Sequence, residues 1–484
     1  MMMRLMLRSM TLALVLALPA VPSGWQALDR KAIPTPGKTP DLRVPSWTKA
    51  TLVNGAELVV SEKHDLPLVS FSITFLGGAD QFEQAGKQGI ASMTATLLSE
   101  GTKTRDADAL SNALQLLGTS VSASVSGESG SINFVSTTAN FPAVLDLLAD
   151  MLVNPVFPEK GLERLRGQRL VALTQARAQP GAIADRVFPR VVYGSAHPYG
   201  RVVTEDSIKS ITRDEVAAFH RTYFQPGRAL ITVVGDVTPG AVRPVIEKAL
   251  QAWPRGGERP TFSYPSPPDP RPTSIVLVDK PGAAQSTFAI GRTGPPRSTA
   301  DFFALQVMNT MLGGMFQSRL NANIREEKGY SYGVRSSFAF GKGPGPFRTG
   351  GDIVTEKSDA ALVEFMKELR GILGERPVTD EELTVAKDAL IQRLPGTFAS
   401  VSSINSAITS LWTQALPDDY YQQYAKLVRA VTKDDVLRVA KQYVTLDRLA
   451  IVIVGDRATI EAPLKKTGIA PIVHYDIEGN PAAQ

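Results

Sequence analysis

The chain has 484 residues, of which 43% are apolar and 20% charged, so it is long enough for two or three domains with real cores. It contains no cysteine, which excludes disulfide bonds, iron–sulfur clusters and cysteine-based zinc sites. The formal net charge is only +5, and no basic run interleaved with aromatic residues indicates binding to nucleic acid.

Residues 1–27 have the pattern of a secretory signal peptide. Arg4 and Arg8 flank an apolar stretch at 10–18, and residues 19–27 are rich in small side chains, with cleavage fitting after either Ala20 or Ala27. The roughly 9 strongly apolar residues are well short of the ~20 that span a bilayer, and no later stretch is long and apolar enough. We therefore expect an exported protein without a transmembrane segment, located in a bacterial periplasm.

The pattern of the next 200 residues mixes strands and helices without a strict β–α–β rhythm, which favours an α+β fold. Strands are predicted at 51–53, 57–60, 66–76, 120–138 (two strands) and 229–234, and helices at 88–98, 106–117, 143–153, 159–179 and 216–224. The small polar residues of 120–138 pack poorly in the middle of a sheet, so we expect this stretch at an edge, where a peptide could add as a further strand.

An internal repeat divides the chain. The helix starts at Thr212 and Thr432 lie 220 positions apart, and each is followed at the same distance by a tyrosine and a strand ending in Val-Gly-Asp. The repeat predicts two homologous α+β domains, 46–252 and 273–462, each with a mostly antiparallel or mixed sheet packed against helices. A linker rich in proline, glycine and charge, 253–272, joins them, and 463–484 form a tail of lower order.

The strongest candidate for a functional site lies in residues 312–338. A glycine hinge leads into a helix that ends at Gly329, and a strand with alternating large residues follows. Arg325 on the helix and Tyr332 on the strand can converge, and their guanidinium and phenol groups are both donors suited to a carbonyl or an oxyanion. The structural alternative is a salt bridge from Arg325 to Glu326 or Glu327 beside a half-buried tyrosine.

This stretch resembles the segment Ser-Arg-Leu-x4-Arg-Glu-x-x-Gly-x-x-Tyr of the pitrilysin/insulinase zinc peptidases (the inverzincins). The resemblance covers nearly the whole chain after the signal peptide and implies two duplicated domains that form a clam-like half-shell. It also implies that Arg325 and Tyr332 bind substrate and stabilise the transition state at a zinc ion held by another domain.

The zinc-binding half of the family pattern is missing. Active members carry His-x-x-Glu-His on a first-domain helix, where the histidines bind zinc and the glutamate is the base. Within the matching frame of residues 86–102, Ser92 and Thr96 stand at the histidine positions and Ala95 at that of the base. The third ligand would fall at or beside Ala172, and no carboxylate lies between Arg164 and Arg177. We therefore expect this chain to bind no metal itself.

No other catalytic pattern in the sequence replaces the missing zinc-binding motif. The four histidines, His64, His197, His220 and His474, are isolated from one another, and there is no Gly-x-Ser-x-Gly elbow. The glycine-rich stretch 341–351 lacks the ending of a phosphate loop and is predicted to be a turn between strands.

Three functions fit this pattern. The leading hypothesis is a non-catalytic subunit of a heterodimeric metallopeptidase, in which a homologous partner with His-x-x-Glu-His supplies zinc and this chain supplies Arg325 and Tyr332. Its substrates would be unfolded peptides. The alternatives are a non-enzymatic peptide-binding or scaffold protein of the same fold, and an autonomous peptidase with an unrecognised site.

Overall fold

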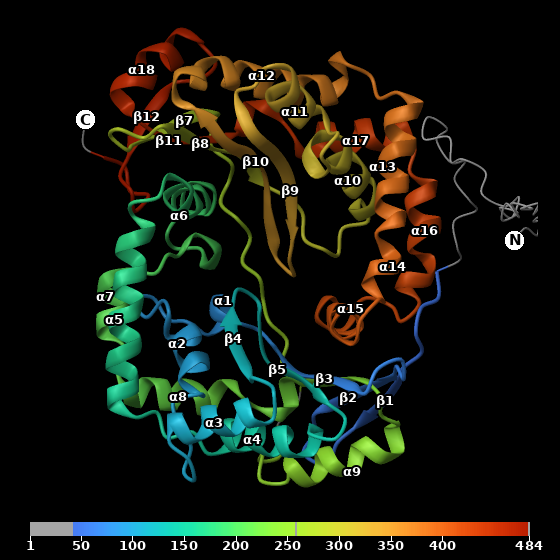
Figure 1. Cartoon of the computed structure of the whole chain (residues 1–484). Coiled ribbons are helices and arrows are strands. Elements are labelled where there is room, and N and C mark those ends of the chain that lie inside the picture. Colours follow the sequence, from blue (N-terminus) through green and yellow to red (C-terminus); the bar gives the residue numbers. More distant parts are fainter. Residues whose placement is uncertain (1–41, 257–258, 483–484) are drawn as a thin grey trace, which may run out of the picture. The chain divides into compact units, whose positions relative to one another are not determined.

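The computed structural model describes residues 42–256 and 259–482. The predicted signal peptide therefore lies outside the described residues. Two six-stranded sheets organise this part of the chain, the first from residues before 236 and the second from residues after 273 (Figure 1). The expected α+β class with mixed, mostly antiparallel sheets is confirmed.

The first sheet has the order β1-β2-β6-β3-β5-β4, with only β2 and β6 parallel. Its strands are β1 (Thr48–Thr51), β2 (Glu57–Glu62), β3 (Leu68–Leu76), β4 (Ser122–Ser126), β5 (Ser129–Thr137) and β6 (Ala229–Gly235). The helices of this part are α1 (Ala79–Phe82), α2 (Ile90–Leu97), α3 (Ala107–Leu116), α4 (Phe141–Val153), α5 (Glu159–Ala176), α6 (Pro180–Tyr193), α7 (Glu205–Ser210), α8 (Arg213–Tyr223) and α9 (Pro239–Ala249). Of the two strands predicted in 120–138, β4 lies at the edge, whereas β5 is internal because it pairs with both β4 and β3.

The second sheet has the order β12-β7-β11-β8-β10-β9. Its strands are β7 (Ser274–Asp279), β8 (Gln285–Thr293), β9 (Ser331–Phe340), β10 (Pro344–Val354), β11 (Ala450–Gly455) and β12 (Ile472–Tyr475). The helices are α10 (Phe302–Asn309), α11 (Arg319–Asn321), α12 (Ser358–Arg370), α13 (Asp380–Gln392), α14 (Leu394–Thr397), α15 (Val401–Gln414), α16 (Tyr420–Ala430), α17 (Lys433–Tyr443) and α18 (Arg457–Lys466). Five strands of each sheet follow one order, since β2, β6, β3, β5 and β4 correspond to β7, β11, β8, β10 and β9. The repeat seen in the sequence is thus a repeat of topology.

The two sheets exchange one helix each. Helix α6, from the first part of the chain, packs on the second sheet, where Ile183, Val187 and Phe188 are buried against strands β7, β8 and β11. Helix α15, from the second part, packs on the first sheet, where Ile404 and Ile408 are buried against β2 and β6. Pro180 and Ser400, which precede or begin these helices, are again 220 positions apart. The exchange explains why strands such as β6, with the sequence Ala-Leu-Ile-Thr-Val-Val-Gly, are buried on both faces.

Two expectations for the second part of the chain are wrong. Residues 463–484 are not simply a tail of lower order, because α18 continues to Lys466 and β12 pairs in parallel with β7. The glycine-rich stretch forms a turn only at 341–343, and the rest belongs to β10, where glycine lets neighbouring backbones approach closely.

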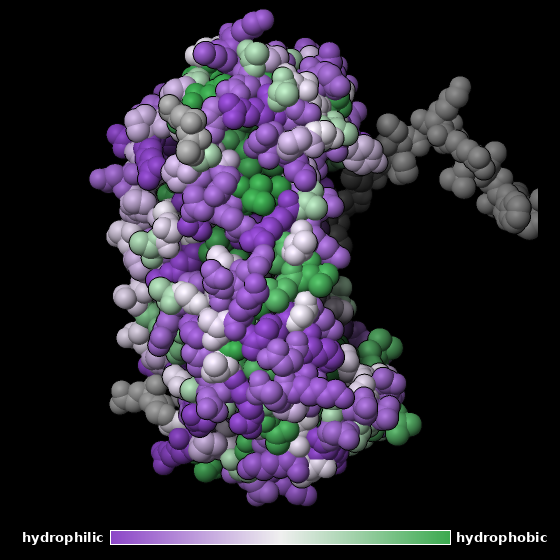
Figure 2. Space-filling model, turned by 90° about the vertical axis from the view of Figure 1, so that its left-hand side faces the viewer, coloured by the Kyte–Doolittle hydropathy of each residue, from purple (hydrophilic) through white to green (hydrophobic). Residues whose placement is uncertain are grey.

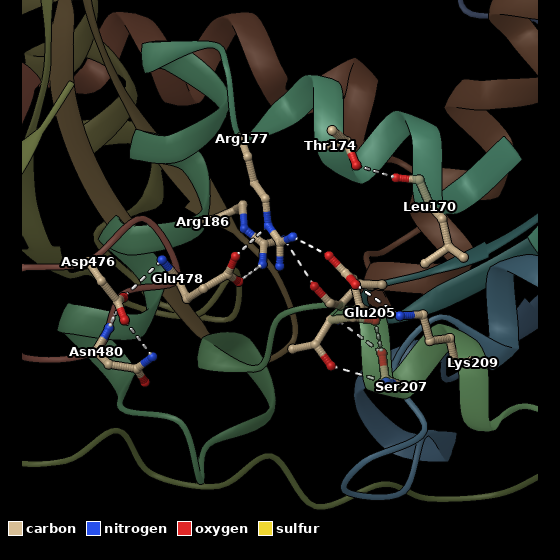
Figure 3. A network of polar contacts seen from close by, with 12 residues as sticks. Leu170, Thr174, Arg177, Arg186, Glu205, Ser207, Lys209, Asp476, Glu478 and Asn480 are labelled. Atoms are coloured by element: carbon tan, nitrogen blue, oxygen red, sulfur yellow. Dashed lines mark hydrogen bonds and ion pairs between the residues drawn. The ribbon is translucent and has the colours of Figure 1, made fainter. Parts of the chain in front are cut away.

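A network of ion pairs holds the segment after β12 against the first part of the chain (Figure 3). The carboxylate of Glu478 accepts hydrogen bonds from Arg177, at 2.7 Å, and from Arg186, and Arg177 also contacts Glu205 of α7. Asn480 accepts a further hydrogen bond from Arg190 at 2.7 Å. The chain's last described segment is therefore fixed by charge-assisted hydrogen bonds to α6 and to Arg177 at the end of α5, while Glu205 of α7 holds Arg177 in turn.

Along the face that carries α5 and α7, apolar side chains gather in small groups separated by polar ones (Figure 2). This pattern is typical of an ordinary solvent-facing surface. Among the described residues, no helix is both long enough and apolar enough to cross a membrane.

Candidate functional site

Arg325 and Tyr332 meet at the start of the edge strand β9. Arg325 lies on the π-helix η4 (Ala322–Glu327), which follows α11, and Tyr332 is the second residue of β9. The guanidinium carbon of Arg325 lies 5.3 Å from the centroid of the Tyr332 ring and 4.4 Å from that of Phe316. The two predicted residues thus converge, with the arginine in contact with the faces of both aromatic rings.

The exposure of these side chains separates the two interpretations of the sequence. The salt bridge is present, since Arg325 Nε lies 3.2 Å from a carboxylate oxygen of Glu326. Tyr332, however, is 89% exposed, and Phe316 is 60% exposed. The tyrosine is therefore not half-buried as the structural alternative expected. An aromatic pair held at the surface by an arginine is available to a ligand.

The pair lines a cavity of about 710 Å³. Gly313, Gly314, Gly350 and Gly351 form part of its wall, and a Cβ atom on Gly313 would lie 2.4 Å from the backbone nitrogen of Ser336. Two further arginines, Arg335 and Arg393, line the same cavity, against one aspartate, Asp352. Its excess of guanidinium groups suits a carbonyl oxygen or a developing negative charge.

Buried polar contacts fix the turn that presents Arg325. The guanidinium of Arg319, 6% exposed, donates to both carboxylate oxygens of Glu382 at 2.7 Å and to the carbonyl of Arg376 at 2.9 Å. Asn321 accepts a hydrogen bond from the backbone N–H of Val334 at 3.2 Å, which ties α11 to β9. The predicted single helix before Gly329 is instead α11 between two π-helices, η3 (Thr310–Gly314) and η4. Such π-helical turns are frequent at functional sites.

The predicted positions of the degenerate metal site lie on α2 and α5. Ser92 and Thr96 are one turn apart on α2 and bond their own helix, Ser92 to the carbonyl of Gly89 at 3.1 Å and Thr96 to that of Ser92 at 2.9 Å. Ala95 is buried, whereas Ala172 on α5 is exposed. These side chains offer hydroxyl and methyl groups where a zinc site needs imidazole and carboxylate.

Arg169 of α5 stands beside this position. Its Nη2 lies 3.3 Å from Thr96 Oγ1, and its Nε is buried without a hydrogen-bond partner among the described residues. A guanidinium next to the place of the second histidine repels a divalent cation. The residues present therefore do not fit zinc, and no group of three or more potential metal ligands exists in residues 42–256 and 259–482.

The helix that carries the degenerate positions is capped by a buried carboxylate. Glu83 accepts hydrogen bonds from the backbone N–H groups of Gly89, at 2.9 Å, and Ala91, at 3.0 Å. Burial raises the pKa of Glu83 from 4.5 to about 7, although both N–H groups favour its ionised form. Burial, reinforced by Glu128, likewise raises the pKa of Asp80 to about 6.

Because the folded state binds these protons more tightly than the unfolded chain, the contribution of Asp80 and Glu83 to the free energy of unfolding falls as the pH rises from about 4 to about 7. The variant Glu83→Gln keeps an acceptor oxygen for the two N–H groups but does not titrate. We expect its urea midpoint to change less than that of the wild type between about pH 5 and about pH 7.5. Equal changes in the two proteins would show that Glu83 titrates normally.

The two groups of predicted residues lie on different sheets, with α2 on the first and β9 at the edge of the second (Figure 1). No hydrogen bond or ion pair of the described residues joins them. Sequence reasoning missed Phe316, Arg335, Arg393 and Arg169. Phe316 lies within the glycine-hinge segment, so the signal was present, whereas the positions of Arg169 and Arg393 depend on tertiary packing.

Two family models match the chain. Residues 58–193 match the model described as insulinase (peptidase family M16), and residues 210–390 match that of the peptidase M16 inactive domain. An uncharacterized zinc protease of Streptomyces coelicolor is 25% identical over 81% of this chain and 86% of its own length. A Helicobacter pylori protein named a non-peptidase homolog is 23% identical over 83% of this chain and 92% of its own length.

Solved structures share the fold. A peptidase M16 inactive domain from Pseudomonas fluorescens superposes with a TM-score of 0.76 at 24% identity, covering 84% of this chain and 98% of that structure. A protease from Helicobacter pylori gives a TM-score of 0.76 at 21% identity, covering 85% of this chain and 100% of that structure.

Proposed function

Because the chain belongs to the insulinase family of peptidases, family M16, we propose that it is the non-catalytic subunit of a heterodimeric metallopeptidase. A homologous partner with an intact His-x-x-Glu-His helix would hold the zinc ion and the base. This chain would add Arg325 and Tyr332, whose donors would bind the substrate carbonyl and stabilise the oxyanion. The substrates would be unfolded peptides, and export by the N-terminal signal would place the complex in the periplasm of a bacterium.

The observation that carries the proposal is that one chain retains the Arg325/Tyr332 pair but lacks the residues that would bind zinc. Arg325 and Tyr332 lie within 5.3 Å of each other at a cavity, whereas the positions of the metal ligands hold Ser92, Thr96 and a nearby guanidinium. An arginine in contact with two exposed aromatic rings is a surface that can hold a peptide substrate. The loss of the zinc ligands, together with the retention of Arg325 and Tyr332, therefore favours an active site shared with a partner subunit.

Edge strands offer a means of holding the peptide. Strands β4 and β9 each form the edge of a sheet, and β9 carries Tyr332. A peptide added to such an edge would gain backbone hydrogen bonds that are largely independent of its sequence.

A scaffold or peptide-binding role is the second candidate, supported by the Helicobacter pylori relative, which is named a non-peptidase homolog. In that case Arg325 and Tyr332 would be dispensable, and the protein would work without a zinc-bearing partner.

The test is chelator-sensitive cleavage of an unstructured reporter peptide by two samples. One sample is the protein purified alone, and the other is tagged protein recovered from its native host. We expect activity only in the second sample, together with a second chain of similar size. No cleavage by either sample would favour the scaffold role. Cleavage by the isolated chain would contradict the assignment as a non-catalytic subunit.

A further inference from the structure

A second cavity lies away from Arg325 and Tyr332. Its volume is about 1020 Å³, and it is lined by the end of α6, the linker at 268–272, the strands β7, β8, β11 and β12, and the last described residues. This is at the upper end of the range for small-molecule sites, which is about 300–1000 Å³.

The walls of this cavity are partly apolar and partly polar, and the apolar residues lie along its length. They include Val191, Val192, Val276, Ile472 and Val473, and three prolines of the linker add to them. All four residues of β12, Ile472–Tyr475, line the cavity, and Arg457 lines one end of it. Four residues of extended chain span about 13 Å, so the cavity is long enough for an extended, unbranched molecule.

Its cations are not equivalent. At the end of β11, Arg457 pairs with Glu461 at 2.6 Å, and the same carboxylate bonds His474 at 3.0 Å, so this end is neutralised. Arg292, Arg448 and Arg271 line the cavity near the start of β7 and β11, against Asp269 and Asp447, the latter 3.5 Å from Arg448. Positive charge therefore exceeds negative charge at one end only.

Arg292 is the most buried of these three arginines. It donates a hydrogen bond from Nη1 to Thr445 Oγ1, but its Nε is buried and has no partner among the described residues. Burial lowers the pKa of the Arg292 guanidinium, and Arg448 lowers it further, while Asp447 acts in the opposite direction. A bound anion would offset the repulsion between the Arg292 and Arg448 guanidinium groups, which burial makes more costly.

We propose that this cavity binds a single-chain amphiphilic anion, with a carboxylate or phosphate head at Arg292 and an apolar chain along α6 and β12. The head needs a negative charge, because Arg292, Arg448 and Arg271 make this end of the cavity cationic. The chain can be apolar, because Val191, Val192 and Val473 line the space between the charged ends, although Ser195 and Tyr475 line it too. This site is independent of the peptidase assembly.

The experiment is calorimetric titration of the full chain with decanoate and decyl phosphate as the two anionic heads, and with 1-decanol and inorganic phosphate as separate halves of the ligand. We expect saturable 1:1 binding of at least one anion, and binding roughly tenfold or more weaker for decanol and for phosphate. The anion that binds more tightly identifies the head group.

Arg292→Gln should weaken binding of the anion roughly tenfold, as expected for loss of a charge-assisted hydrogen bond. Arg448→Gln removes a neighbouring charge from a side chain that is 54% exposed, so it tests the same end without disturbing the core. The matched control is Arg243→Gln on α9, an exposed arginine paired with Glu247 outside the cavity.

The proposal would be overturned if Arg448→Gln and a folded Arg292→Gln both bind the anion as tightly as the wild type does. If Arg292→Gln fails to fold, Arg448→Gln decides alone. Decanol binding as tightly as the anions, or no saturable binding of either anion, would equally overturn it.

Discussion

Replacing Arg325 with alanine, or Tyr332 with phenylalanine, is expected to lower turnover by the native complex by a factor of about 10² to 10³ without dissociating it. Each change removes one donor that would face the developing oxyanion, and a preorganised donor of this kind is worth about 3–4 kcal/mol in the transition state. The measurement is kcat for the reporter peptide, with size-exclusion chromatography to verify that both chains remain together.

Matched controls separate chemistry from folding. Tyr330→Phe removes a phenol hydroxyl two residues before Tyr332, from a side chain that packs partly against the second core. Arg243→Ala removes an exposed guanidinium from α9. Both should leave kcat unchanged, and full activity of Arg325→Ala and Tyr332→Phe in a verified complex would remove the catalytic role from this pair.

Phe188→Ala is expected to lower the free energy of unfolding by about 3–5 kcal/mol, because it removes a buried aromatic ring and leaves a cavity. Phe188 is 1% exposed and lies where α6 packs on the second sheet. Since α6 belongs to the first part of the chain, we expect both sheets to lose stability in one transition. The measurement is urea unfolding, followed by tryptophan fluorescence and by far-ultraviolet circular dichroism.

The control for this change is Val171→Ala on the neighbouring helix α5, where the side chain is 58% exposed. Surface substitutions of this kind change stability by no more than about 0.5 kcal/mol. A Phe188→Ala variant as stable as this control would show that α6 is not held by its buried face.

Much of the fold was predictable because its signals are local or periodic. Continuous apolar runs such as residues 229–234 identify buried strands, and the spacing of 220 residues between Thr212 and Thr432 identifies the duplication. The helix exchange was not predictable from periodicity. The apolar face of α6 indicates that the helix is buried, but the sequence does not specify which of two similar sheets it covers.

The candidate site likewise has some features that the sequence predicts and others that depend on tertiary packing. Arg325 and Tyr332 converge because a helix end and a strand start are close in sequence, so seven residues suffice to place them. The short helix α11 that leads to Arg325 is held instead by Arg319 binding Glu382, a contact across 63 residues. The guanidinium of Arg169 at Thr96 depends on the packing of α5 against α2, which no local pattern encodes.

The exchange of α6 and α15 gives the duplication a simple history. A protein with one copy of the repeat would have to leave a sheet face bare, with its own apolar helix directed away from it. Two such proteins would cover each other by swapping these helices, so the ancestral unit would have been an obligate dimer. In the present chain the segment that joins the copies links them covalently and also contacts the first part of the chain, as Phe262 does at Phe82. Cutting it would yield two fragments that remain clasped by α6 and α15.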